Sequence, residues 1–216
     1  MLPARLVVLG DYAFSGISGL QSVTFAEGSR LTTIGSYTFQ NTAIKEFTLP
    51  ANVVTMGSYN FASCSSLVSF SFNNSIKSIG NGNLEGTGIK EIYIPACITS
   101  MGINNFANCS RLASVTFAPD TRLVTIPAGT FANTALTEIR IPASIKSLGG
   151  KIILEDDEEV DPNEPTSYGV FEGCRSLTKV EFENGSVCSI LGAAAFSGCS
   201  ALKSRSEEHT SELQSP

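Results

Sequence analysis

One apolar position, nearly always aromatic, recurs along the chain about every 23 residues, and this periodicity constrains the fold more than any other feature of the sequence. Successive members are 22 to 25 residues apart, except for one interval of 40 that equals an ordinary interval of 22 plus an insertion of 18. The members are Phe14, Phe39, Phe61, Leu84, Phe106, Phe131, Phe171 and Phe196. Because one unit of this length cannot bury its apolar face alone, the units must stack. The sequence therefore predicts a solenoid of about eight repeats.

Short alternating runs of apolar, polar and apolar residues lie between these aromatic positions and predict strands with one buried face. The seven runs are residues 23–25, 47–49, 70–72, 92–94, 115–117, 139–141 and 180–182. Pro50, Pro95 and Pro142 follow every second run and end the strand, because proline cannot donate a ladder hydrogen bond. A further apolar pair then turns the chain toward the next coil. We expect one parallel sheet along one side, with short turns or short helical segments on the other.

The repeat itself carries a family resemblance. Residues 61–72, FASCSSLVSFSF, return as residues 106–117, FANCSRLASVTF, and alternate with a form such as residues 89–102, IKEIYIPACITSMG. These motifs resemble the BspA-type leucine-rich repeat. The resemblance implies a right-handed leucine-rich-repeat solenoid over residues 1–204, in a surface or secreted protein engaged in adhesion, host contact or aggregation. Its partner would be a protein, such as an extracellular-matrix or host surface protein. The asparagine ladder of other leucine-rich repeats is absent from the positions after the strands.

Two segments depart from the repeat. Residues 151–166 are strongly acidic and predict a solvated loop inserted between two coils; the alternative is a cation-binding or partner-docking loop, but the glycine and ligand spacing of a calcium loop are missing. Residues 205–216 have no repeat character, and one choice of codons for them spells the read-through of a common sequencing adapter. We expect them to be a disordered, non-native tail. The array also starts without a cap, so we expect a fragment truncated at both ends.

Those two segments together carry a charge of −8, more than the net charge of −6 of the whole chain. Residues 151–166 carry seven acidic residues against one lysine, and residues 205–216 carry three against one arginine, which leaves +2 for the rest of the chain. A nucleic-acid-binding face needs clustered Lys and Arg, so we expect no nucleic-acid partner. No apolar stretch is long enough to insert into a membrane, and the N-terminus lacks the features of a signal peptide. We expect a monomer, and the cellular location stays open.

Few residues could support catalysis or bind a metal. The single histidine, His209, lies in the tail, which removes histidine-dependent triads and histidine-ligated zinc from the repeats. Cys64, Cys109, Cys174 and Cys199 share one repeat position, where other coils have Thr42, Thr87, Thr134 or Ile17. This equivalence predicts small, inward, reduced thiols. Cys97 and Cys188 fall at core-edge positions, and no zinc-type cysteine spacing exists. We therefore expect no cofactor, no metal and no enzymatic activity.

The remaining candidate is the solvent side of the strands. Its mid-strand positions are Thr48, Ser71, Tyr93, Thr116, Arg140 and Glu181, which we predict to bind a protein partner. Tyr93 and Arg140 are the residue types most often found as binding anchors. Three functions stay open: an adhesion or recognition module, an intracellular scaffold, or the repeat region of a larger protein whose catalytic domain lies elsewhere.

Overall fold

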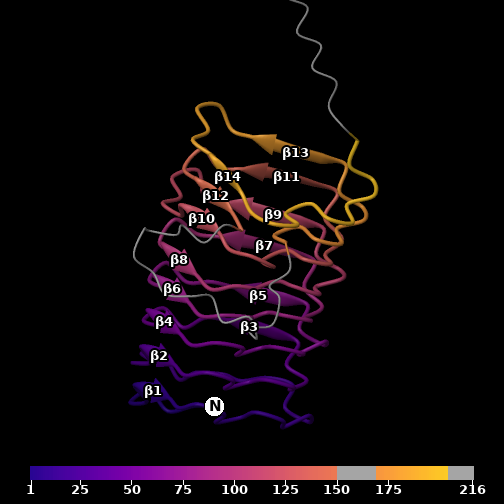
Figure 1. Ribbon diagram of the computed structural model, residues 1–216. Coiled ribbons are helices and arrows are strands. Elements are labelled where there is room, and N and C mark those ends of the chain that lie inside the picture. The colour runs from indigo at the N-terminus through magenta and orange to yellow at the C-terminus, as the bar shows by residue number, and fades with distance from the viewer. Residues whose placement is uncertain (150–168, 204–216) are drawn as a thin grey trace, which may run out of the picture.

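The computed structural model describes residues 1–149 and 169–203, and in them the chain winds into coils stacked along one axis (Figure 1). Two columns of short parallel strands run along the stack, and turns join them without any helix in the described ranges. This confirms the parallel leucine-rich-repeat solenoid and shows that turns, rather than short helices, complete each coil. The acidic insertion 151–166, the tail 205–216 and His209 lie outside the described residues.

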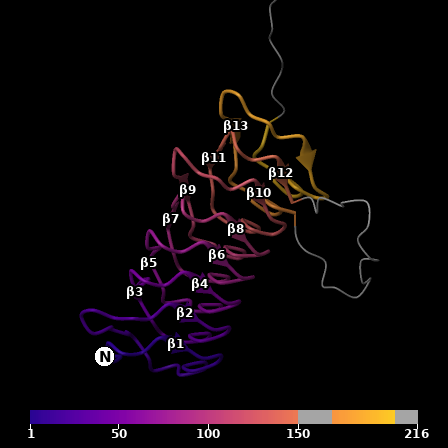
Figure 2. The same cartoon turned by 90° about the vertical axis from the view of Figure 1, so that its left-hand side faces the viewer.

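The longer strands form one column, visible along one side of the stack in Figure 2. They are β3 (Glu46–Thr48), β5 (Ser69–Ser71), β7 (Glu91–Ile94), β9 (Ser114–Phe117), β11 (Glu138–Ile141) and β13 (Lys179–Phe182). Six of the seven predicted strands therefore exist, shifted by about one residue. The seventh, at residues 23–25, is wrong: within it, Phe25 makes only an isolated parallel bridge with Leu2.

A second column, which the sequence analysis treated only as turns, consists of two-residue strands. They are β1 (Val8–Leu9), β2 (Thr33–Ile34), β4 (Thr55–Met56), β6 (Ser78–Ile79), β8 (Ser100–Met101), β10 (Thr125–Ile126), β12 (Ser147–Leu148) and β14 (Ile190–Leu191). They form two ladders, β1-β2-β4-β6-β8 and β10-β12-β14. Ile34, Met56 and Ile79 are buried core residues in equivalent positions. Most coils thus have two strand segments, the expected parallel strands along one side and an additional column of two-residue strands.

The longer strands hydrogen-bond only two by two, as β3–β5, β7–β9 and β11–β13. The prolines explain this pairing. The Leu49 N–H donates to the Ser71 carbonyl of the following coil at 2.9 Å, and since successive residues of a strand direct their backbone groups to opposite sides, Pro50 faces the preceding coil. The carbonyls before Pro95 and Pro142 likewise accept from the following coil. In all three cases the missing N–H faces the side where no ladder forms.

The recurring aromatic residues stack as a column inside the coils, as predicted. Ring centroids of neighbouring coils are 5.2–5.6 Å apart and the ring planes differ by at most 17°. Leu84 interrupts the column between Phe61 and Phe106, and all three side chains belong to one buried core. Phe131 stacks directly on Phe171 at 5.6 Å, so the 40-residue interval leaves the register of the coils intact.

An asparagine ladder does exist. It lies directly before the recurring apolar position, and not after the strands, where the sequence shows no such ladder. Asn60, Asn83 and Asn105 are fully buried, each immediately before the recurring apolar position. The backbone N–H and Nδ2 of Asn60 both donate to Oδ1 of Asn83, at 3.2 and 3.1 Å, and the Asn83 N–H donates to Oδ1 of Asn105 at 3.1 Å. Side-chain oxygens thus satisfy backbone donors that the turns leave unpaired inside the stack.

Truncating one ring of the aromatic column should destabilise the whole stack. For Phe61→Ala we expect the free energy of unfolding to fall by about 3–5 kcal/mol, because the ring is fully buried between two coils. Urea denaturation followed by circular dichroism measures the loss. The exposed Thr48→Ala should change stability by less than about 0.5 kcal/mol. Equal effects of the two variants would contradict the aromatic column as the main source of stability.

The asparagine ladder gives a second prediction. Asn83→Ala removes the acceptor shared by two buried donors of Asn60, so we expect a loss of about 2 kcal/mol or more in the same assay. Asn74→Ala is the matched control, because Asn74 is exposed. A loss at position 83 no larger than at position 74 would show that the ladder contributes little.

Candidate functional site

The six residues predicted to bind a partner are all exposed and lie on the outward side of the longer strands. We call this surface the strand face: Thr48, Ser71, Tyr93, Thr116, Arg140 and Glu181. They form three side-by-side pairs in the strand register, Thr48 with Ser71, Tyr93 with Thr116 and Arg140 with Glu181. The structure therefore brings the predicted residues into one column on the outward side of the longer strands.

Tyr93 stands in a hollow between β5 and β7, where the hydrogen-bonded ladder is interrupted. Its side chain is 54% exposed although it is large and aromatic. The hollow, which we call the Tyr93 groove, has a volume of about 580 Å³. Its other lining residues are Val68, Ser69, Phe70, Ser71, Lys90, Glu91, Ile92, Ser114 and Thr116. The wall around the tyrosine ring therefore combines four small hydroxyl-bearing residues with three apolar residues and one charge of each sign.

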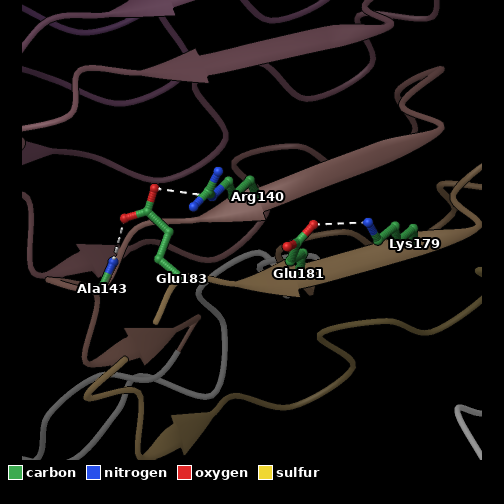
Figure 3. Close-up of polar contacts among 5 residues, drawn as sticks. All are labelled: Arg140, Ala143, Lys179, Glu181 and Glu183. Carbon is green, nitrogen blue, oxygen red and sulfur yellow. Dashed lines mark hydrogen bonds and ion pairs between the residues drawn. The ribbon is translucent and has the colours of Figure 1, made fainter. Parts of the chain in front are cut away.

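A second hollow of about 480 Å³, the Arg140 groove, lies between β9 and β11 at the next interruption. Here the charges neutralise one another (Figure 3): Arg140 Nε is 3.2 Å from Glu183 Oε1, and Lys179 Nζ is 2.9 Å from Glu181 Oε2. The other oxygen of Glu183 accepts from the Ala143 N–H at 3.1 Å. Arg140 thus lies on the outward side of its strand, as predicted. Its guanidinium forms an ion pair with Glu183, a residue that the sequence did not single out.

The buried thiols are structural, as predicted. All six cysteines are free, and the four at the shared repeat position are buried. Cys109 Sγ donates to the Leu84 carbonyl at 3.0 Å and lies 3.2 Å from Oγ1 of Thr87, and the Thr42–Cys64 and Thr134–Cys174 pairs repeat this arrangement. Threonine and cysteine are therefore partners in adjacent coils, and not merely small residues that replace one another. Burial raises the pKa of the Cys109 thiol from its ordinary 9.0 to about 11, which keeps it protonated and unreactive.

A stack of three tyrosines at the turns escaped the sequence analysis. The rings of Tyr12, Tyr37 and Tyr59 lie 4.8 and 5.2 Å apart, two residues before the recurring aromatic position. All three have positive φ, which bulky residues rarely adopt. The stack ends at Gly82, where a Cβ would lie 2.3 Å from the Tyr59 ring. The ring of Tyr37 is covered on both faces by its neighbours, whereas Tyr12, at the end of the stack, is 59% exposed.

Neither a cluster of metal-ligand side chains nor a membrane-spanning helix is found in the described part of the chain. Within residues 1–149 and 169–203, no three histidine, cysteine, aspartate or glutamate side chains cluster as a metal site would require. The same residues contain no helix with the length and apolar character needed to cross a bilayer.

The fold and its outward strand surface define a leucine-rich-repeat protein with a candidate interaction face. Consistent with this, the sequence profile of the BspA type leucine-rich repeat region matches in six copies, over residues 1–110, 32–155 and 164–214. The chain belongs to this family. No curated protein matches it.

Solved structures of bacterial leucine-rich-repeat proteins share the fold. A leucine-rich repeat protein from Bacteroides ovatus superposes with a TM-score of 0.66 at 26% identity, covering 93% of this chain and 58% of that one. A Treponema (T. pallidum) leucine-rich repeat protein gives 0.67 at 21% identity, over 91% and 82%. A leucine-rich cell surface protein from Faecalibacterium prausnitzii gives 0.50 at 18% identity, over 93% and 76%. The chain thus spans little more than half the length of the Bacteroides protein.

The raised thiol pKa predicts a pH dependence. Because the folded-state pKa of Cys109 lies above its unfolded value, the stability that it contributes is complete below pH 9 and is lost as pH rises toward about 11. Cys109→Ser cannot titrate in this range. Between about pH 8 and about pH 10.5 we expect it to lose about 2 kcal/mol less than the natural chain in urea unfolding. Equal losses in both proteins would show that the thiol does not resist ionisation.

Proposed function

We propose that this chain is a non-catalytic protein-interaction module of a surface or secreted adhesion protein, and that its partner binds the strand face. One observation carries the proposal: the strand face is exposed and contributes nothing to the buried core, whereas the inward positions and side-chain ladders hold the scaffold together. Residues that the fold does not need are free to serve recognition. A rigid stack also presents them with little loss of conformational entropy on binding.

Support for adhesion at a surface comes from the family and from one structural relative. The BspA-type repeat is shared over most of the chain, and the Faecalibacterium protein is described as a cell surface protein. An extracellular-matrix or host surface protein is therefore the partner class that we propose. The exposed face has both signs of charge and hydroxyl groups, a mixture that suits a polar protein surface.

The six free thiols favour a second candidate, an intracellular scaffold. Structural disulfides are typical of small secreted proteins, and none forms here. However, the thiols at the repeat position are buried and hydrogen-bonded to the neighbouring coil, so they stay reduced without help from a reducing compartment. This weakens the argument for an intracellular location. A catalytic domain elsewhere in a longer protein stays a third prediction.

Binding to an immobilised basement-membrane extract tests the proposal. We expect the double variant Tyr93→Ala, Arg140→Ala to lose about tenfold or more in apparent affinity, because anchors of these types dominate interfaces. The control is Thr55→Ala, Ser100→Ala, two exposed substitutions on the other strand column. Circular dichroism confirms that both variants are folded. Equal binding of the natural chain and the strand-face variant, or an equal loss in the control, would reject the strand face as the interface.

A further inference from the structure

We propose that the Tyr93 groove receives an arginine side chain of the partner polypeptide. This inference rests on the proposed function, because it names the chemistry recognised at the same face. It assigns the Tyr93 ring, the Glu91 carboxylate and the open seam between β5 and β7 to one binding pocket.

The ring of Tyr93 is placed to stack on a planar cation. Its register partner on β9 is Thr116, and Ser71 shares the groove on the β5 side, so both neighbours are short. No other aromatic ring contacts Tyr93 among the described residues, in contrast to the stacked tyrosines at the turns. A guanidinium group stacks on such a ring through cation–π attraction, and arginine does so more often than lysine.

Glu91 supplies the complementary charge. It precedes Tyr93 by two residues on the same strand, so both side chains point outward, and it is exposed and lines the groove. The two ion pairs found in the described part of the chain involve other residues, which leaves Glu91 available to a cation from outside. A carboxylate beside an aromatic ring allows a bidentate salt bridge together with stacking. Lys90 also lines the groove, and its positive charge repels an incoming arginine. Removing this charge should therefore strengthen binding, whereas removing the charge of Glu91 should weaken it.

The seam between the strands adds backbone acceptors. The Ile94 carbonyl accepts from the Ala118 N–H of the following coil, so the alternate residues Glu91 and Tyr93 direct their backbone groups toward β5. No ladder joins β7 to β5, and the carbonyls on this side of β7 face the groove. Guanidinium has five N–H donors, so it can donate to these carbonyls and to Glu91 at the same time. An apolar side chain has no such donors.

The Arg140 groove does not offer the same site. Arg140 occupies the position equivalent to Tyr93, and Glu183 already binds its guanidinium at 3.2 Å. An added cation would meet that arginine rather than an aromatic ring. The two grooves therefore differ in what they accept, although the same interruption of the ladder creates both.

The test uses the full chain labelled with ¹³C in its tyrosine rings and the capped peptide Ac-Gly-Gly-Arg-Gly-Gly-NH₂. In an NMR titration we expect the Tyr93 ring signals to shift with a dissociation constant on the order of 1 mM, while the signals of Tyr12, Tyr37 and Tyr59 stay in place. The peptide with citrulline in place of arginine keeps the shape but loses the charge, and it should bind at least fivefold more weakly. Equal binding of the two peptides, or no shift at Tyr93, overturns the proposal.

Charge variants make the test specific. Glu91→Gln should weaken binding about fivefold, and Lys90→Ala should strengthen it; Glu46→Gln, the same substitution two coils away, should leave it unchanged. If methyl mannoside shifts the Tyr93 signals at lower concentration than the arginine peptide, the groove is a saccharide site and the proposal is wrong. Shifts that depend only on protein concentration would assign the groove to a second copy of the chain instead. Retained matrix binding with failed arginine binding would reject this inference and leave the proposed function standing.

Discussion

Every coil of this protein depends on the contact between a side chain and its counterpart one coil away. Parallel strands set the coils about 4.8 Å apart, which is close to the distance at which aromatic rings stack. The observed ring spacing of 5.2–5.6 Å shows how closely the two requirements agree. A coil without neighbours would leave its ring exposed, as the only partly buried Phe14 and Phe196 at the two ends indicate. Stability is thus a property of the stack and not of a single repeat.

The physical repeat is a pair of coils, although the sequence repeat is one coil of about 23 residues. One coil of each pair carries threonine and ends its strand with proline; the other carries cysteine and one more residue in the turn. The Thr87–Cys109 contact and the β7–β9 ladder join such a pair from inside and outside. Between pairs, the proline faces the seam and cannot donate. The Thr–Cys contacts and the ladders of the longer strands therefore strengthen the same junctions. The Asn60–Asn83 bonds and the column of two-residue strands hold the alternate junctions together.

The features that repeat once per coil could be predicted from the sequence. The features that depend on which side chains of neighbouring coils contact each other could not. The spacing of residues such as Phe61 and Phe131 predicted the column, because burial requires one apolar residue per coil. The strand face followed from alternation alone. The Asn60–Asn83–Asn105 ladder was not predicted, because these asparagines precede the recurring apolar position, whereas the ladder of other leucine-rich repeats lies after the strands. The Arg140–Glu183 pair could not be predicted, since the two residues come from adjacent coils separated by the insertion.

The open seams connect the fold to its proposed function. At the β5–β7 and β9–β11 seams no hydrogen-bonded ladder joins the strands, and a hollow lies on the outward side of each. The outward residues of the proline-ending strands, Thr48, Tyr93 and Arg140, each border a seam and differ greatly in size and charge. Under the proposed function, changing such a residue would alter recognition without disturbing the hydrogen-bonded pair behind it. A solenoid of this kind can therefore vary its outward surface chemistry at every second coil while the stacked core stays the same.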